Sequence, residues 1–224
     1  MSVDSQAAKE RLAVIGEIAA EVAHELRNTL QVIAASAYLA KQDPAASLVH
    51  IQKIERNARL AHAIVDDLMT LARGEPAHAE PVLFAEIMVA ARTDMAPGCA
   101  TWNDQVTPAD LRVRAHPGLL TRLFHVLYEN AIGACIGRAP TITTRAGASA
   151  APGRVVIDVI DDGPGVPEEI AARIFDPLVT GRIGGTGLGL ALAKRIAAAH
   201  GGSIELSATS SAGATFRIEL AGTK

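Results

Sequence analysis

The chain of 224 residues has little of what secreted, membrane-spanning or nucleic-acid-binding proteins require. Its two cysteines, Cys99 and Cys135, stand apart without metal-ligand spacing, which fits a reducing compartment and small buried side chains. No apolar run reaches the roughly 18 residues that span a bilayer, and the N-terminal MSVDSQAAKER lacks the apolar segment of a signal peptide. A formal net charge of -3 leaves no cationic surplus for nucleic acid. We therefore expect a cytoplasmic protein with no nucleic-acid partner, either whole or the soluble part of a larger or membrane-associated receptor.

The first third of the chain has the apolar spacing of long helices that pack lengthwise. Apolar or small residues recur at alternating steps of three and four, at Leu12, Ile15, Ala19, Val22, Leu26, Thr29, Ile33, Ser36 and Ala40. Asp43 and Pro44 suit the start of a second helix, which repeats the spacing at Ile51, Ile54, Ala58, Ala61, Val65, Leu68 and Ala72. Further apolar residues widen this stripe beyond what one neighbouring helix covers. Two chains that pair into a four-helix bundle would bury it.

A change of pattern near residue 75 predicts a domain boundary. Gly74 suits a helix end and Pro76 cannot continue a helix, so we expect domains at residues 1–75 and 82–224 joined by a linker at 76–81. Beyond the linker, helical patterns at 82–95, 118–136 and 187–199 alternate with strand-like runs at 111–115, 141–145, 155–160, 203–207 and 215–220. A hairpin loop is expected at 146–153. The predicted fold class is α+β, with a helical hairpin followed by an α/β sandwich.

The segment HELRN in the first predicted helix holds candidate catalytic residues. The heptad spacing turns His24 away from the seam and toward solvent, where an imidazole with a pKa of about 6.5 offers a neutral nucleophilic nitrogen. Glu25 could accept the proton of the other ring nitrogen. Asn28, one turn along the same face, could orient a water or a phosphoryl group. By itself, the segment is more typical of an ordinary exposed helical histidine with charged neighbours, and only the other motifs favour a catalytic role.

Two glycine-rich segments lie in the second region. Asp161-Asp162-Gly163-Pro164-Gly165 follows a strand-like run, and its glycines allow a tight turn that a flat ring can approach, beside a carboxylate that accepts a hydrogen bond from an amine. Residues 184–190, GGTGLGL, open an amphipathic helix whose first N–H groups and dipole suit a phosphate. This second segment is neither a Walker motif nor a dinucleotide-binding fingerprint. Each segment alone could be a structural turn.

Five segments in order resemble the H box, N box, first glycine box, F box and second glycine box of two-component sensor histidine kinases: AHELRN, HPGLLTRLFHVLYENAIGA, DDGPG, IFDPLVTG and GGTGLGLALAKRIAAAHGG. The resemblance covers nearly the whole chain. It implies a dimerisation and histidine phosphotransfer domain at residues 1–75 and a Bergerat-fold ATP-binding domain, shared with gyrase- and MutL-type ATPases, at 82–224. The implied activity is autophosphorylation of His24 from ATP with Mg²⁺ in a homodimer, followed by transfer to an aspartate in the receiver domain of a response regulator. Dephosphorylation of that regulator is a further activity that the resemblance leaves open.

The resemblance also implies roles for individual residues. His24 matches the phospho-acceptor, Glu25 its acid/base neighbour and Asn28 the residue that aids dephosphorylation of the regulator. Asn130 matches the Mg²⁺ ligand and Asp161 the adenine-binding aspartate. The other nucleotide-binding positions match the turn beneath the base, the aromatic at the base of the ATP lid, a basic residue near the phosphates and the glycine box that cradles the triphosphate: Gly163 and Gly165, Phe175, Arg182, and Gly185, Thr186, Gly187, Leu188 and Gly189.

Two positions depart from the family pattern. Thr29 replaces a proline, which removes an expected helix kink but no chemical group. Val126 stands where the family usually has a second asparagine, which removes one polar contact to the metal or the phosphates. His125 could compensate, although the helix aims it about 100° away.

The sequence leaves three alternatives to a kinase: a phosphotransferase, an ATP hydrolase and a scaffold. A dimeric histidine phosphotransferase with weak or no ATP binding is favoured by Val126 and by the lack of a sensor domain, whereas the intact glycine boxes oppose it. An ATP hydrolase of the gyrase type needs a glutamate four residues before Asn130, and Val126 occupies that place. A pure scaffold would leave both glycine boxes unexplained.

Overall fold

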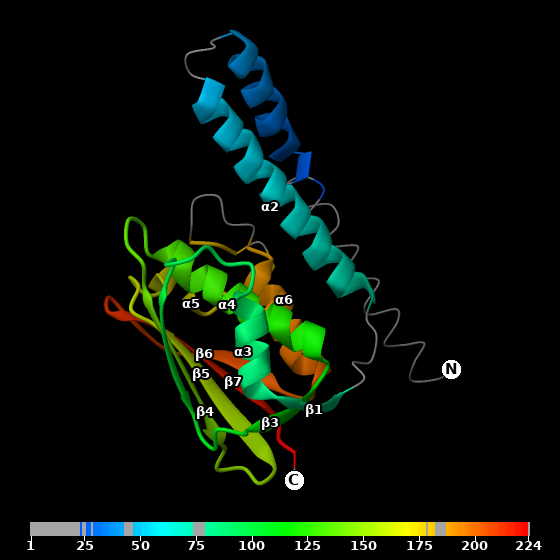
Figure 1. Ribbon diagram of the computed structural model, residues 1–224, viewed down its shortest axis with the longest axis vertical. Coiled ribbons are helices and arrows are strands. Elements are labelled where there is room, and N and C mark those ends of the chain that lie inside the picture. The colour runs from blue at the N-terminus through cyan, green and yellow to red at the C-terminus, as the bar shows by residue number, and fades with distance from the viewer. Residues whose placement is uncertain are drawn as a thin grey trace. The chain divides into compact units, whose positions relative to one another are not determined.

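A computed structural model describes residues 23, 26–27, 29–42, 47–73, 79–177, 179–181 and 187–223 of the chain. The chain divides into two compact units, Met1–Glu75 and Pro76–Lys224. The described part of the first unit is helical, and the second unit combines helices with a sheet (Figure 1). The fold is therefore of the mixed α+β class.

The first unit contains a helical segment at 29–42 and helix α2, Ser47–Arg73. In the first helix the predicted seam is correct where it is described, because Thr29 and Ser36 are buried. The start of that predicted helix, residues 12–22, lies outside the described residues. In α2, Asn57 is buried, and its Nδ2 donates to the carbonyl of Lys53 at 2.8 Å.

The seam predicted for α2 is only partly correct. Ile54 and Ala61 are half-buried, whereas Ile51, Ala58 and Val65 are exposed. The apolar stripe is wider than one neighbouring helix can cover. Leu48 and Ile51 accordingly stay exposed in the single chain.

The second unit is built on a five-stranded sheet in the order β2-β4-β5-β7-β6. The strands are β2 (Thr101–Val106), β4 (Thr141–Ala148), β5 (Arg154–Asp161), β6 (Ser203–Ser210) and β7 (Gly213–Ala221). β2 runs parallel to β4, and the other neighbours are antiparallel. A separate pair joins β1 (Glu80–Leu83) to β3 (Arg112–Ala115). Alternate residues of β5 and β7 are buried, so one face of the sheet forms the core.

Helices α3 (Phe84–Arg92), α4 (Pro117–Ala134) and α6 (Gly189–Ala199) cover that face, and α5 (Glu168–Ala171) is a single short turn (Figure 1). Helix α4 contacts both α3 and α6. It begins at Pro117 because a proline suits the first helical position and Nδ1 of His116 accepts the N–H of Leu119 at 3.3 Å. Fully buried side chains from α4, α6 and the inner sheet face fill the core, among them Leu123, Leu127, Leu192, Ile157 and Ile218.

The structure corrects several predicted boundaries. The helix predicted at 82–95 begins at Phe84, since Val82 and Leu83 pair with β3. The loop predicted at 146–153 is shorter, because β4 continues to Ala148 opposite β5. Strands β1 and β2 were not predicted, as both are short and their residues are mostly polar or exposed.

Candidate functional site

Several predicted site residues fall on parts of the chain that the structure does not describe. His24, Glu25 and Asn28 lie outside the described residues, as do Arg182, Gly185 and Thr186. Ala23, Leu26 and Arg27, which flank the histidine and its neighbours, are helical. The description of the site therefore rests on the second unit.

Asp161 lies at the end of β5, buried and held by two backbone donors. Its Oδ1 accepts the N–H of Gly163 at 2.9 Å and the N–H of Ala214 at 3.3 Å. Burial raises the pKa of the Asp161 carboxyl above its ordinary value, while the two N–H groups oppose that shift. No hydrogen bond from the described part of the chain reaches Oδ2. This oxygen can accept a hydrogen bond from an exocyclic amine.

The turn after Asp161 requires both of its glycines. A Cβ on Gly163 would stand 2.7 Å from Oδ1 of Asp161 and 3.3 Å from Sγ of Cys135. Gly165 has φ +76°, and a Cβ there would overlap the carbonyl oxygen of Ser210. The backbone of the turn is thus packed closely against its neighbours at both glycines.

Asn130 and Val126 lie one turn apart on the same side of α4. Val126 is buried, and its Cγ1 would stand 3.0 Å from a Cβ placed on Gly189, the first residue of α6. That side of α4 therefore faces the start of α6. Asn130, one turn along α4 from Val126, is half-buried.

The described end of that glycine-rich segment consists of Gly187, Leu188 and Gly189. Gly187 has φ +66°, and Leu188 is fully buried with its carbonyl accepting the N–H of Leu192 at 2.9 Å. Helix α6 therefore starts with a buried anchor and leaves its first N–H groups without intrahelical acceptors. Such a terminus suits an anionic phosphate.

His125 does not replace the missing asparagine. Its Nδ1 lies 3.0 Å from the carbonyl oxygen of Ala91 in α3, and its Nε2 lies 3.4 Å from a carboxylate oxygen of Glu129. The hydrogen bond to Glu129 raises the pKa of His125. The suggestion that His125 compensates for Val126 is wrong, because the imidazole is committed to the contact between α3 and α4.

Phe175 packs against the strand that carries the core. Its ring meets that of Phe216 in β7 edge to face at 6.2 Å, and Nζ of Lys194 in α6 lies 6.0 Å from its centroid. The segment that follows Phe175 is thereby anchored at its base. The family resemblance assigns this residue to the base of an ATP lid.

The sequence did not point to the hairpin between β6 and β7, which meets the Asp161 turn directly. Ala214 donates to Asp161, and the hydroxyl of Thr209 accepts the N–H of Val166 at 2.7 Å. Gly213 has φ +135°, and a Cβ there would overlap the carbonyl oxygen of Asp161. The glycine in the turn SAGAT was the available signal, since close backbone approach requires glycine.

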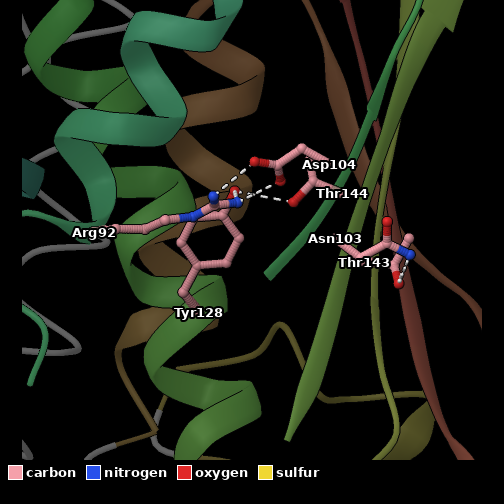
Figure 2. A network of polar contacts seen from close by, with 6 residues as sticks. All are labelled: Arg92, Asn103, Asp104, Tyr128, Thr143 and Thr144. Carbon is pink, nitrogen blue, oxygen red and sulfur yellow. Dashed lines mark hydrogen bonds and ion pairs between the residues drawn. The ribbon is translucent and has the colours of Figure 1, made fainter. Parts of the chain in front are cut away.

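A second unpredicted feature fixes α4 against the edge of the sheet. Figure 2 shows Arg92 of α3 reaching Asp104 of β2, with hydrogen bonds of 2.8 and 2.7 Å, while Tyr128 of α4 meets both Arg92 and Thr144. The guanidinium lies 4.2 Å from the ring centroid of Trp102 and 4.9 Å from that of Tyr128. Tyr128 is two residues before Asn130, so this network fixes the helix that carries the candidate metal ligand.

A metal ion would depend on few protein ligands here. Among the described residues, no three His, Cys, Asp or Glu side chains gather as a metal site. The amide oxygen of Asn130 is a suitable donor for Mg²⁺, which commonly takes one or two protein ligands and completes its shell with phosphate and water. The described helices include none long and apolar enough to cross a membrane.

These features define a nucleotide-binding α/β domain that follows a helical domain. Residues 14–77 match the family described as His Kinase A (phospho-acceptor) domain, and residues 115–224 match histidine kinase-, DNA gyrase B-, and HSP90-like ATPase. The chain belongs to the two-component sensor histidine kinases and corresponds to their catalytic core.

Known relatives share this arrangement. Sensor histidine kinase ZraS of Salmonella typhi is 35% identical over 97% of this chain and 48% of its own length. Sensory histidine kinase/phosphatase NtrB of Rhodobacter capsulatus is 32% identical over 89% of this chain and 60% of its own length. Histidine kinase ThkA, in complex with response regulator protein TrrA, superposes with a TM-score of 0.78 at 24% identity, over 98% of this chain and 65% of that chain. The chain thus spans about half the length of ZraS, and the ThkA likeness concerns the fold alone.

Proposed function

We propose that this chain transfers the γ-phosphate of ATP to its own His24 and then to an aspartate of a response regulator. The observation that carries the proposal is the Asp161 carboxylate. One of its oxygens is fixed by two backbone N–H groups and the other is open to an amine, within a domain that matches histidine kinase-like ATPases. A domain that had lost its nucleotide would have no physical need for this arrangement.

The nucleotide would be oriented by groups at two ends of the site. Oδ2 of Asp161 accepts the adenine amine, and the Gly163–Gly165 turn lies beneath the base. By the family resemblance, the N–H groups at the start of α6 would receive the phosphates together with Gly185, Thr186, Gly187, Leu188 and Gly189, Arg182 would be the basic residue near them, and Phe175 would stand at the base of the lid. Asn130 would hold Mg²⁺, which neutralises phosphate charge when bound.

At His24, one neutral ring nitrogen attacks the γ-phosphorus as the bond to the bridging oxygen breaks and ADP leaves. The proton on the other ring nitrogen passes to Glu25, which leaves a phosphoramidate on the histidine. Positioning and charge neutralisation carry most of such a transfer, so few protein groups need to act chemically. Asn28 would orient a water when the phosphorylated regulator is hydrolysed.

The first unit supports the dimer. Large apolar side chains stay exposed on both of its helices, namely Leu30, Tyr38, Leu39, Leu48, Val49, Ile51 and Val65. Residues 14–77 match the phospho-acceptor family, and a second copy of the chain would supply two more helices. A dimeric four-helix bundle would cover these side chains.

The partner is a receiver-domain protein. The similar fold of ThkA occurs in a complex with a response regulator, and NtrB is named as a kinase and phosphatase. On those grounds we assign the regulator as phosphate acceptor and, through Asn28, as a substrate for dephosphorylation.

A fluorescent ATP analogue titrated with Mg²⁺ tests the proposal against the phosphotransferase alternative. The proposal requires saturable binding that ATP displaces and that Mg²⁺ strengthens. A chain that binds no analogue, yet accepts phosphate from a phosphorylated receiver domain, would be a phosphotransferase.

A further inference from the structure

The Asp161 turn is held from both sides by residues outside the five sequence motifs. On one side stands Arg138, in the connection between α4 and β4. On the other side stands Thr209, near the end of β6 in the β6–β7 hairpin. Because β4 and β7 are the two neighbours of β5 in the sheet, the contacts reach the end of β5 from opposite directions.

Arg138 forms two hydrogen bonds with Asp162, the residue that follows Asp161. Its Nη1 donates to Oδ1 of Asp162 at 2.9 Å, and its Nη2 donates to the Asp162 carbonyl oxygen. The N–H of Thr141 donates to the same Oδ1 at 3.0 Å. Although desolvation acts in the other direction, the hydrogen bonds from Arg138 and Thr141 lower the pKa of Asp162, so this carboxylate stays charged and bound.

Thr209 fixes the other end of the turn. Its Oγ1 accepts the N–H of Val166 at 2.7 Å, and a Cβ on Gly165 would stand 2.9 Å from the same oxygen. The turn therefore has one fixed end at Asp162 and another at Val166. Between them lie only Gly163, Pro164 and Gly165. The two glycines lack a Cβ, so they restrict the backbone conformation of the turn little by themselves.

We propose that Arg138 and Thr209 are positioning residues that aim the free oxygen of Asp161 at the nucleobase and so set the preference for adenine. The inference rests on the proposed nucleotide-binding function and deepens it. Neither side chain needs to touch the nucleotide. Each acts through the backbone of the turn, whose N–H at Gly163 donates to Oδ1 of Asp161, so that Oδ2 receives no hydrogen bond from the described residues.

Comparing the affinities of ATP and inosine triphosphate tests whether Oδ2 of Asp161 is oriented to bind an exocyclic amine. Adenine carries an exocyclic amine that donates to Oδ2, whereas hypoxanthine carries a carbonyl oxygen in its place and cannot. The ratio of the Kd of inosine triphosphate to that of ATP therefore reports the orientation of Asp161. A variant that merely unfolds a fraction of the molecules reduces the number of binding sites but leaves this ratio unchanged.

The experiment compares Arg138→Met and Thr209→Val with the wild type by calorimetry, using both nucleotides. Each variant should bind ATP about tenfold more weakly, because one hydrogen bond to a charged or fixed group is lost. The ratio of the Kd of inosine triphosphate to the Kd of ATP should fall to a similar extent. Arg138→Lys keeps the charge and one donor, and should restore part of the ratio.

Arg217→Met is the matched control. Arg217 in β7 forms an ion pair of the same kind with Asp158 of β5, at 2.8 and 3.0 Å, on the face of the sheet opposite the core. Its loss should leave the ratio at the wild-type value.

An unchanged ratio in folded Arg138→Met and Thr209→Val would overturn the inference while leaving the proposed function intact. If Arg138→Met fails to fold, Arg138→Lys and Thr209→Val decide the matter alone. A wild-type chain that binds neither nucleotide would instead overturn the proposed function, and the positioning role with it.

Discussion

Val126 of α4 lies directly against Gly189, the first residue of α6, with Cγ1 3.0 Å from the place where a Cβ would stand. The valine occupies the position where related kinases usually carry an asparagine, and it uses the room that the glycine leaves. The contact puts residue 126 beside the start of α6, one turn from Asn130.

Because residue 126 lies there, Val126→Asn should place an amide near the metal and the phosphates. We expect a lower Mg²⁺ requirement and autophosphorylation roughly ten- to hundredfold faster, the range typical of residues that support a metal ligand. The rate measured across an Mg²⁺ titration checks this. Val126→Ala, which removes bulk and adds no amide, is the control. If Val126→Asn leaves the metal dependence unchanged or unfolds the domain, the valine is an ordinary core residue.

Asp161→Asn exchanges the open acceptor oxygen for a donor while preserving shape. The variant should stay folded and bind ATP about ten- to hundredfold more weakly, as expected for a lost hydrogen bond to a charged group. Asp158→Asn alters the same strand on its other face and should leave nucleotide affinity unchanged. Equal affinities of wild type and Asp161→Asn in calorimetry would place the base elsewhere.

His200 links stability to pH. The imidazole is buried, with Nε2 accepting the N–H of His116 at 2.9 Å and Nδ1 2.7 Å from the carbonyl of Ile196, an arrangement that suits only the neutral ring. Desolvation lowers the pKa of His200 below its model-peptide value of 6.5, and the nearby His116 acts in the same direction. The unfolded chain therefore binds a proton more readily, so this contribution to stability is present above pH 6.5 and is lost as pH falls through the folded-state pKa.

Urea unfolding at pH 7.5 and at lower pH should reveal that loss, at most about 1.4 kcal/mol per pH unit for one proton. His200→Gln keeps an acceptor for His116 without titrating, so its stability should fall less steeply. Parallel pH profiles for wild type and variant would show that His200 contributes nothing to the acid sensitivity.

The exposed apolar face of the first unit predicts a dimer at micromolar concentration. Light scattering of Leu48→Glu combined with Ile51→Glu should show a shift toward monomer, because charges would be buried in the bundle. Gln52→Glu adds a charge at an exposed neighbouring position of α2 and should remain dimeric. A monomeric wild type would leave the apolar face unexplained.

Much of the second unit was predictable from the sequence where residue patterns are regular. Apolar alternation and β-branched residues marked β5, β6 and β7, and helical spacing marked α4 and α6. Strand β2 was missed because Asp104 points toward the helices to meet Arg92, so a charged residue occupies a place where alternation requires an apolar one. The ion pair between Arg92 and Asp104, and the stacking of Arg92 on Trp102 and Tyr128, depend on three-dimensional neighbours that local patterns do not contain.

The candidate site divides in the same way. Asp161, Gly163 and Gly165 were predicted because a tight turn constrains residue type locally. Arg138 and Thr209 were not, since their partners lie 24 and 43 residues away in the chain and no motif relates them. The prediction that His125 could compensate for Val126 is wrong because the residue spacing in α4 does not reveal the contact of His125 with Ala91 in α3.

The central claim is tested most directly by incubating the purified chain with Mg²⁺ and ATP labelled at the γ-phosphate, then measuring protein-bound label after acid and after base. The account predicts an acid-labile, base-stable label in the wild type, as a phosphoramidate requires, and none in His24→Gln. Label that persists in folded His24→Gln, or that resists acid, would contradict phosphorylation of His24.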